Sequence, residues 1–296
     1  TVANISCGFD ILGLCLDTVG DEMIVREVPE KGIRLTKITG QKLPLETHKN
    51  VAGVAGLALL EQVDTSVGYE IEIYKKIKPG SGIGSSAASA AGAVFAINEL
   101  LGKPFSKQEL IYFAMQGEKL ASGTEHADNV SPVILGGFTL VRSYKPLDVL
   151  KINSPDDLYA TIIHPQIEVK TSDSRAVLKN QVSLKKMVTQ MGNFGGLISG
   201  LYTNNYDLIG RSLHDEIIEP NRLVLIPEFD KVKKGVIQAG ALGAGISGSG
   251  PSIFALSKGK ETANIVGETM AEIYNTTDID YDIHVSKINQ QGIKIL

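Results

Sequence analysis

The stretch KIKPGSGIGSSAASAAGA, from Lys76 to Ala93, decides the fold prediction for this chain. It carries three glycines within five residues (Gly80, Gly82 and Gly84), then two serines and a run of small residues. A glycine-rich loop of this kind has two interpretations. It can cradle a phosphate, or it can be a tight turn that leads into a closely packed helix. The stretch is neither G-x-x-x-x-G-K-[ST] nor G-x-G-x-x-G, so it matches neither common phosphate motif.

The flanking residues predict a strand before the loop and a helix after it. Tyr69–Tyr74 alternates apolar and polar side chains with a period of two. Ala87–Leu101 is rich in alanine and is followed by Gly102 and Pro104, which end a helix. The free N–H groups at such a helix start attract an anion, and glycines let the backbone approach phosphates closely. Ser85 and Ser86 would add hydroxyls for phosphate or magnesium.

Composition predicts a globular protein and excludes several classes. The chain has 296 residues, of which 43% are hydrophobic and 21% charged, and its net charge is -4. The absence of a basic field argues against nucleic-acid binding. We also expect no membrane span, no metal or redox role for Cys7 and Cys15, and a cytoplasmic location. Because Thr1 stands almost inside a motif, we expect further residues to precede it, and no secretory leader is visible.

The remaining pattern predicts an α+β chain in two parts. Ile11–Val28 predicts two strands with a turn at Gly20–Asp21, and Asn50–Gln62 an amphipathic helix. Ser106 and Glu109 form a capping box for a helix that runs to about Leu120. The segment Val133–Val141 predicts a strand with a Gly-Gly bulge. Further strands and helices are predicted in the second half at Leu158–Val169, Ser183–Tyr202, Asn205–Ile217, Glu228–Leu242 and Gly243–Ser257. The division between two α+β units is expected near residues 145–155.

Three segments resemble the motifs of the GHMP small-molecule kinases, in order and over nearly the whole chain. Pro79–Ala90, PGSGIGSSAASA, resembles the ATP-binding motif Pro-x-x-x-Gly-Leu-x-Ser-Ser-Ala, with Ile83 in place of the leucine. Ala3–Asp10, ANISCGFD, is similar to the first motif, in which a glycine is usual where Ser6 stands. Gly243–Leu256, GAGISGSGPSIFAL, is similar to the third motif, although it could also be a turn needed only for packing. The resemblance implies a ribosomal-S5-like ATP-binding domain over 1–150 and a ferredoxin-like domain over 151–296.

The resemblance also implies a nucleotide site with magnesium. ATP would be the co-substrate and Mg²⁺ the cofactor, with Ser86 and Glu118 as metal ligands. The implied ATP-binding residues are Asn50, Pro79, Gly80, Ser81, Gly82, Ile83, Gly84, Ser85, Ser86 and Ala87.

The acceptor alcohol has to be identified from polar residues elsewhere. An amino-acid alcohol such as homoserine carries an ammonium and a carboxylate, so its site needs an acidic group and arginine forks. The segments around Arg175 and Arg222 resemble carboxylate binders of family members that act on homoserine, and Asn4 with Asp10 resembles their amino-group site. The implied acceptor-binding residues are Asn4, Asp10, His126, Asn129, Arg175, Arg222 and Gly248.

Asn129 stands where mevalonate-kinase-like members place a catalytic aspartate, and an amide cannot accept the hydroxyl proton. We therefore expect catalysis without a protein general base, by positioning and charge neutralisation, with Asn129, Glu118 and Ser86 as the catalytic residues. The expected reaction is ATP-dependent phosphorylation of the hydroxyl of L-homoserine in threonine biosynthesis.

Other interpretations remain at this stage. The acceptor could be a mevalonate-like or sugar alcohol, although the set of Asp10, Asn129, Arg175 and Arg222 argues against it, since a sugar needs no such paired charges. The chain could be a catalytically silent paralogue that binds a metabolite, although both Ser86 and Glu118 are present. An RNA-binding module is disfavoured by the acidic charge. A homodimer is possible.

Overall fold

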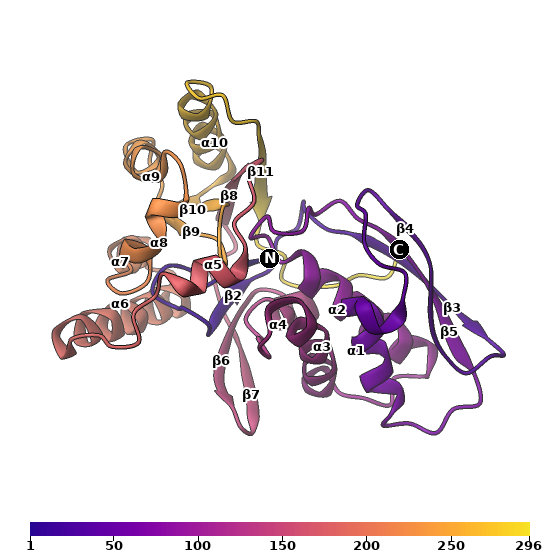
Figure 1. The fold of residues 1–296 in the computed structure, drawn as a ribbon. Helices are drawn as coiled ribbons and strands as arrows, with labels where there is room; N and C mark the ends of the chain where they lie inside the picture. The colour runs from indigo at the N-terminus through magenta and orange to yellow at the C-terminus, as the bar shows by residue number, and fades with distance from the viewer.

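The computed structural model describes all residues from Thr1 to Leu296 and shows an α+β chain built around three sheets (Figure 1). The first half of the chain holds a three-stranded sheet in the order β3-β5-β4 and a helical layer. A four-stranded sheet in the order β1-β2-β6-β7 comes next, and the second half adds a sheet in the order β11-β8-β10-β9. None of the helices is both long enough and apolar enough to cross a membrane.

The strand, loop and helix predicted around Gly80–Gly84 are present. Strand β5 (Gly68–Tyr74) lies between β3 (Glu22–Val28), which is antiparallel to it, and β4 (Gly32–Thr39), which is parallel. Helix α2 (Ser85–Leu100) begins at the first serine after the loop, two residues earlier than predicted. The loop therefore leads directly into the start of a sixteen-residue helix.

Small residues allow the helices of the first half to pack closely. Helix α1 (Val51–Leu60), α2 and α3 (Lys107–Ser122) contact one another, and α3 starts with the predicted capping box of Ser106 and Glu109. A Cβ atom at Gly117 of α3 would stand 2.5 Å from the carbonyl oxygen of Val51. Because α1 is apolar on every side and packs in this layer, it is not the amphipathic helix that the sequence predicted.

The sheet β1-β2-β6-β7 corrects one sequence prediction. Its strands are β1 (Val2–Ala3), β2 (Leu12–Leu14), β6 (Phe138–Tyr144) and β7 (Leu147–Ile152). The predicted strand over Val133–Val141 is wrong in its first half, because Val133–Leu135 ends the short helix α4 (Val130–Leu135). Gly136 and Gly137 both have positive φ, of 73° and 69°, and so end a helix where a strand bulge was expected.

The second half places helices on both sides of an antiparallel sheet. Its strands are β8 (Leu158–Pro165), β9 (Gly243–Ile246), β10 (Ile253–Lys258) and β11 (Tyr281–Lys287). Its helices are α5 (Thr171–Ala176), α6 (Leu184–Thr203), α7 (Tyr206–Ser212), α8 (Glu219–Arg222), α9 (Phe229–Gln238) and α10 (Lys260–Tyr274). Two short 3₁₀ turns complete the chain, at Thr47–Lys49 and Leu223–Leu225.

One core joins the two halves. Leu12 and Leu14 of β2 belong to the same buried cluster as Phe254 and Leu256 of β10. The end of the chain also returns to the first half, since the N–H of Ile293 donates to the carbonyl oxygen of Val133 at 2.8 Å. The predicted division after residue 150 falls inside β7. Cys7 and Cys15 are buried free thiols.

Candidate active site

A cavity of about 470 Å³ lies where the two halves meet, and it collects residues from distant parts of the chain. Its wall is formed by the glycine loop, the segment Asn4–Asp10, the end of α3, the start of α5, and residues of the loop between β9 and β10. Fifteen of the residues predicted for the site line it: Asn4, Asp10, Pro79, Gly80, Ser81, Gly82, Gly84, Ser85, Ser86, Glu118, His126, Asn129, Arg175, Arg222 and Gly248. The structure does not bring Asn50, Ile83 and Ala87 to this wall.

The glycine loop needs its glycines for conformation and for space. Gly80, Gly82 and Gly84 have φ between 72° and 78°, a region that L side chains rarely adopt. A Cβ at Gly82 would also stand 2.6 Å from the carbonyl oxygen of Ser247, and one at Gly84 would stand 2.0 Å from the Thr1 hydroxyl. These contacts fix the loop against the third motif and the N-terminal segment.

The start of α2 presents unpaired donors to the cavity. Gly84 is the N-cap of this helix, and as a glycine it has no side chain to cap the first N–H groups. The N–H groups of Ser85, Ser86 and Ala87 therefore have no acceptor from the helix. Three N–H donors and the positive end of a sixteen-residue helix suit a phosphate group.

The serine hydroxyls of the loop have different partners. Ser85 donates to the carbonyl oxygen of Ile77 at 2.8 Å, and Ser81 accepts from the N–H of Ile83 at 3.3 Å. Ser86 is the loop serine whose hydroxyl faces Glu118. The resemblance implied Ser86 as the metal ligand, and the bond of Ser85 to Ile77 leaves Ser86 as the better candidate of the two serines.

Glu118 is a buried carboxylate at the same end of the cavity. Its Oε1 atom has no hydrogen-bond partner, and burial raises the pKa of the group to about 7, against the opposing influence of the Ser86 hydroxyl and Lys75. A buried, unpartnered carboxylate oxygen beside a serine hydroxyl fits a hard cation such as Mg²⁺. The structure contains no cluster of three or more His, Cys, Asp or Glu residues suited to a metal. Phosphate oxygens and water would have to complete the coordination.

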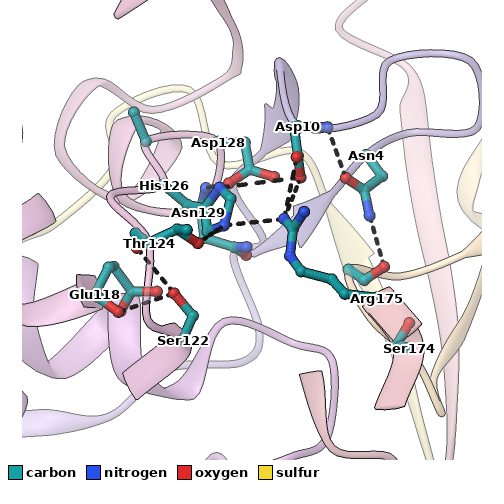
Figure 2. Close-up of polar contacts among 12 residues, drawn as sticks. Asn4, Asp10, Glu118, Ser122, Thr124, His126, Asp128, Asn129, Ser174 and Arg175 are labelled. Carbon is teal, nitrogen blue, oxygen red and sulfur yellow. Dashed lines mark hydrogen bonds and ion pairs between the residues drawn. The ribbon is translucent and has the colours of Figure 1, made fainter. Parts of the chain in front are cut away.

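Asp10, Arg175 and His126 point toward one another on the opposite side of the cavity (Figure 2). The Nη2 atom of Arg175 donates to both carboxylate oxygens of Asp10, at 2.8 and 3.0 Å, and to Nε2 of His126 at 2.9 Å. Burial lowers the pKa of His126, which agrees with an imidazole that accepts from a guanidinium. Asp10 has a positive φ of 61°, and its N–H donates to Oδ1 of Asn4 at 3.0 Å.

Arg222 lies deeper than Arg175. It is 3% exposed and donates to the carbonyl oxygens of Ser174 and Gly248, at 3.0 and 3.1 Å. Burial, and then the charge of Arg175, lowers the pKa of Arg222 to about 10, so the guanidinium remains charged at neutral pH. Asn4 also donates to the oxygen of Gly248, at 2.6 Å, which ties the first and third motifs together.

The guanidinium groups of Arg175 and Arg222 both lie over the ring of Phe9, a residue that was not predicted from the sequence. The guanidinium carbon of Arg222 lies 4.9 Å from the ring centroid, and that of Arg175 lies 5.6 Å from it. A cation at this distance from an aromatic face is attracted to it. The available signal was the position of this aromatic residue directly before Asp10.

Asn129 and Asp128 stand side by side in the cavity wall. The Oδ1 atom of Asn129 accepts from the Thr1 hydroxyl at 2.7 Å. Burial, with the nearby charges of Asp10 and Glu118, raises the pKa of Asp128 to about 7. Both residues thus line the cavity that also contains the Asp10 carboxylate and the start of α2.

The side chains of Asn50, Ile83 and Ala87 have their partners within the fold. The Asn50 side chain caps α1 by accepting from the N–H of Ala52 at 3.0 Å, and it donates to the carbonyl oxygen of Pro44 at 2.8 Å. Ile83 and Ala87 belong to buried hydrophobic clusters. Lys170, an exposed cation in the cavity wall before α5, was not predicted, because nothing local in its sequence marks it.

Comparisons with known proteins agree with this geometry. Residues 49–137 match the family model of the GHMP kinases N terminal domain, and residues 197–276 match that of the GHMP kinases C terminal domain. The chain is 46% identical to a homoserine kinase of Chlorobium phaeobacteroides over 100% of this chain and 97% of the relative. It is 40% identical to a homoserine kinase of Methanococcus vannielii, over 93% and 91% of the two chains.

Solved structures give the same result. The crystal structure of a homoserine kinase from Cytophaga hutchinsonii is similar with a TM-score of 0.95 and 52% identity, over 98% of this chain and 93% of that one. The L. major mevalonate kinase in complex with R-mevalonate is similar with a TM-score of 0.67 and 18% identity, over 90% and 86% of the chains. At that identity the likeness extends to the fold alone.

Proposed function

Because the chain belongs to the GHMP kinase family, we propose that it transfers the γ-phosphate of ATP to the side-chain hydroxyl of L-homoserine, giving O-phospho-L-homoserine for threonine biosynthesis. The observation that carries this proposal is the Asp10–Arg175 ion pair, with Arg222 in the same cavity wall beside the glycine loop. A sugar carries neither charge, and a mevalonate-like acceptor carries a carboxylate but no ammonium, so neither matches that set of charges.

The acceptor would bind through its two charges. Its ammonium would take the place of Arg175 beside Asp10, and its carboxylate would be held by the forks of Arg175 and Arg222. His126, Asn4 and Gly248 would complete the pocket, since all three already contact these groups or their neighbours. A zwitterion could thus replace the direct bond between Asp10 and Arg175 with one contact to each, so that neither charge is left unpaired.

The nucleotide would bind at the glycine loop. The N–H groups at the start of α2 would receive its phosphates, and Ser86 with Glu118 would hold Mg²⁺. When bound, Mg²⁺ neutralises the charge that develops on the transferred phosphoryl group. Without the cation, the phosphates would meet the Glu118 carboxylate unscreened, so nucleotide binding and magnesium binding should be coupled.

We propose that no protein group removes the hydroxyl proton. Asn129 would orient the hydroxyl through its amide, and the rate would come from positioning and charge neutralisation. The buried free thiols Cys7 and Cys15 are compatible with a cytoplasmic location, where we propose that the enzyme acts.

Coupled measurement of ADP release, with homoserine, mevalonate, galactose and serine as acceptors, tests the proposal. Turnover is expected with homoserine and at least about a hundredfold less kcat/KM with mevalonate and galactose, because a buried charge left unpaired costs about 3 kcal/mol or more. Serine keeps both charges, and its kcat/KM should be about tenfold or more lower because its hydroxyl is one methylene group short of the phosphate. Turnover with mevalonate or galactose but not with homoserine would overturn the proposal. So would the absence of ADP release with homoserine in a chain that binds ATP and homoserine, which would indicate a catalytically silent paralogue.

The role of Arg222 has a sharper test. Arg222→Ala should raise the KM for homoserine at least about a hundredfold and leave the KM for ATP within about threefold, because the lost contact concerns only the acceptor. Arg211→Ala is the matched control, since Arg211 is an exposed arginine paired with Asp207 on α7. Equal losses for ATP and homoserine would argue against the assigned role.

A further inference from the structure

Tyr144, the last residue of β6, contacts two segments that form the cavity wall but does not line the cavity itself. Its hydroxyl donates to the carbonyl oxygen of Asp10 at 2.9 Å and accepts from the N–H of Ala127 at 3.4 Å. Burial, and then the charge of Asp128, raises the pKa of the Tyr144 phenol, so the hydroxyl keeps its proton at neutral pH. One hydroxyl group thus joins two segments from distant parts of the sequence.

The backbone of Asp10 is held by side chains on both sides of its Cα atom. Its N–H donates to Oδ1 of Asn4 at 3.0 Å (Figure 2), and its carbonyl oxygen accepts from Tyr144 at 2.9 Å. The φ of Asp10 is 61°, a left-handed conformation that L residues rarely adopt and that surrounding contacts must hold in place. The two hydrogen bonds therefore fix the point from which the Asp10 carboxylate extends.

The strand that carries Tyr144 is itself bonded to the neighbour of Asp10. The N–H of Val141 on β6 donates to the carbonyl oxygen of Ile11 at 2.8 Å. Strand β6 also pairs with β2 on one side and with β7 on the other. A side chain on a paired strand is positioned more precisely than one on a loop, so Tyr144 can serve as a fixed reference for Asp10.

The second partner of the hydroxyl, Ala127, directly follows His126 of the acceptor pocket. In the ligand-free site, Arg175 bonds to both Asp10 and His126 and so links the same two segments. The bound acceptor would replace the bond between Arg175 and Asp10. The bonds of Tyr144 do not involve Arg175, so they would keep Asp10 at a fixed distance from the segment of His126 after the acceptor has entered.

We propose that Tyr144 is a positioning residue for the acceptor, whose hydroxyl holds the Asp10 carboxylate where the ammonium of the acceptor binds. Because this role assigns the ammonium to Asp10, it rests on the proposed function. Tyr144 makes no hydrogen bond to the glycine loop or to α2, so nucleotide binding should not depend on its hydroxyl.

Steady-state kinetics of Tyr144→Phe, which removes the hydroxyl and keeps the ring, test the proposal. The KM for homoserine should rise about five- to fiftyfold, while kcat and the KM for ATP stay within about threefold, because only the placement of Asp10 is lost. Tyr274→Phe is the matched control, since Tyr274 is a buried tyrosine outside the cavity wall whose hydroxyl donates to the carbonyl oxygen of Pro227 at 2.6 Å. It should keep the wild-type kinetics. An unchanged KM for homoserine in Tyr144→Phe overturns the proposal, as does an equal rise in the KM for ATP.

An acceptor analogue separates positioning of Asp10 from a general loss of packing. The analogue 4-hydroxybutyrate has the hydroxyl and the carboxylate of homoserine but no ammonium, so it makes no contact that depends on the Asp10 carboxylate. Its inhibition constant against homoserine should be the same for the wild type and Tyr144→Phe, within about twofold. A rise as large as that of the KM for homoserine overturns the proposal, because the whole pocket would then have loosened.

Turnover of homoserine by the wild-type chain is measured first. Its absence would overturn the proposed function and, with it, the role of Tyr144. Turnover with wild-type KM values in Tyr144→Phe would contradict the role of Tyr144 alone. Circular dichroism verifies that Tyr144→Phe and Tyr274→Phe are folded.

Discussion

Asp128 is the residue at which the mechanism can be tested most directly. Its pKa of about 7 would suit a general base, and it lines the cavity beside Asn129. A general base contributes about 10²–10⁴ to the rate, so a mechanism without one predicts that Asp128→Asn lowers kcat by less than about tenfold. Steady-state kinetics at saturating ATP and homoserine measure this. A loss above about a hundredfold, with KM and circular dichroism unchanged, would make Asp128 the base.

The same residue predicts a pH dependence of stability. Burial raises the pKa of Asp128 from 3.8 to about 7, so the folded chain holds this proton more tightly than the unfolded chain. Its contribution to stability is complete below pH 4 and is lost as pH rises toward 7. At pH 8, without nucleotide or magnesium, Asp128→Asn should raise the free energy of unfolding by on the order of 1–3 kcal/mol. Urea unfolding at pH 4 and pH 8 measures the difference, which should almost vanish at pH 4.

Asp207→Asn provides the control for that measurement. Asp207 is exposed and forms only a surface ion pair with Arg211, so its loss should change stability by less than about 1 kcal/mol at either pH. An Asp128→Asn gain that is the same at pH 4 and pH 8 would mean that its origin is not the carboxyl proton.

Phe9 is expected to position the two arginines. Phe9→Leu keeps an apolar side chain but removes the aromatic face, so the KM for homoserine should rise about three- to thirtyfold while kcat and the KM for ATP stay within about twofold. Phe9→Tyr should keep the wild-type KM. With 3-aminopropan-1-ol, which lacks the carboxylate, the wild type and Phe9→Leu should have equal KM values. A Phe9→Leu defect of the same size for that acceptor would indicate a loss of packing only.

The local motifs predicted the residues of the site better than they predicted what those residues do. Asp10, Glu118 and Arg175 could be found because each belongs to a short segment with its own pattern. The pairing of Asp10 with Arg175 spans 165 positions in sequence, and the stack on Phe9 is formed only by folding. Asn50 is predicted to bind the nucleotide, and its side chain caps α1, a use that an isolated asparagine in a sequence does not reveal.

At the scale of elements, the glycine loop predicts a contrast between two glycines at the ends of α2. Gly84→Ala should raise the KM for ATP at least about tenfold and lower the melting temperature, because φ is 72° and the new Cβ would clash with Thr1 and Asn129. Gly102→Ala is the matched control, since φ is 81° but its surroundings are open. It should lower stability by about 1 kcal/mol and leave the KM for ATP unchanged. Equal effects of the two substitutions on ATP would remove the steric argument.

Elements with a local start or stop signal were predicted well. The capping box at Ser106 and the alternation in Tyr69–Tyr74 are both confirmed, because each depends on neighbours in sequence. The segment Val133–Val141 failed because apolar residues before Gly136 suit a helix end as well as a strand, and periodicity cannot separate them over three residues. The apolar character of α1 became clear only with the layer that surrounds it.

At the scale of the whole molecule, the end of the chain should contribute to the stability of its beginning. Ile288 is buried, and the backbone of Asn289 and Ile293 bonds to Gly137 and Val133. Removal of residues 288–296 should lower the melting temperature by at least about 5 °C, since the lost apolar burial and hydrogen bonds amount to a few kcal/mol. Removal of residues 294–296 alone loses an exposed ion pair and should lower it by less than about 2 °C. Differential scanning calorimetry measures both, and equal effects would contradict the role of the tail.

The hydrogen bond between Asn4 and Gly248 has a consequence for the order of events on the ribosome. Asn4 meets its partner only after 244 more residues have been added, and the N–H of Gly248 likewise bonds to the carbonyl oxygen of Ala3. Domains generally begin to fold from the N-terminal side during synthesis, so the layer around α2 can assemble early. The acceptor pocket cannot close until β10 and the segment after it have emerged from the exit tunnel. A nascent chain would therefore form helix α2 long before the glycine loop could bond to Ser247 and Ser252 or the acceptor pocket could close, so the full site is among the last features to form during translation.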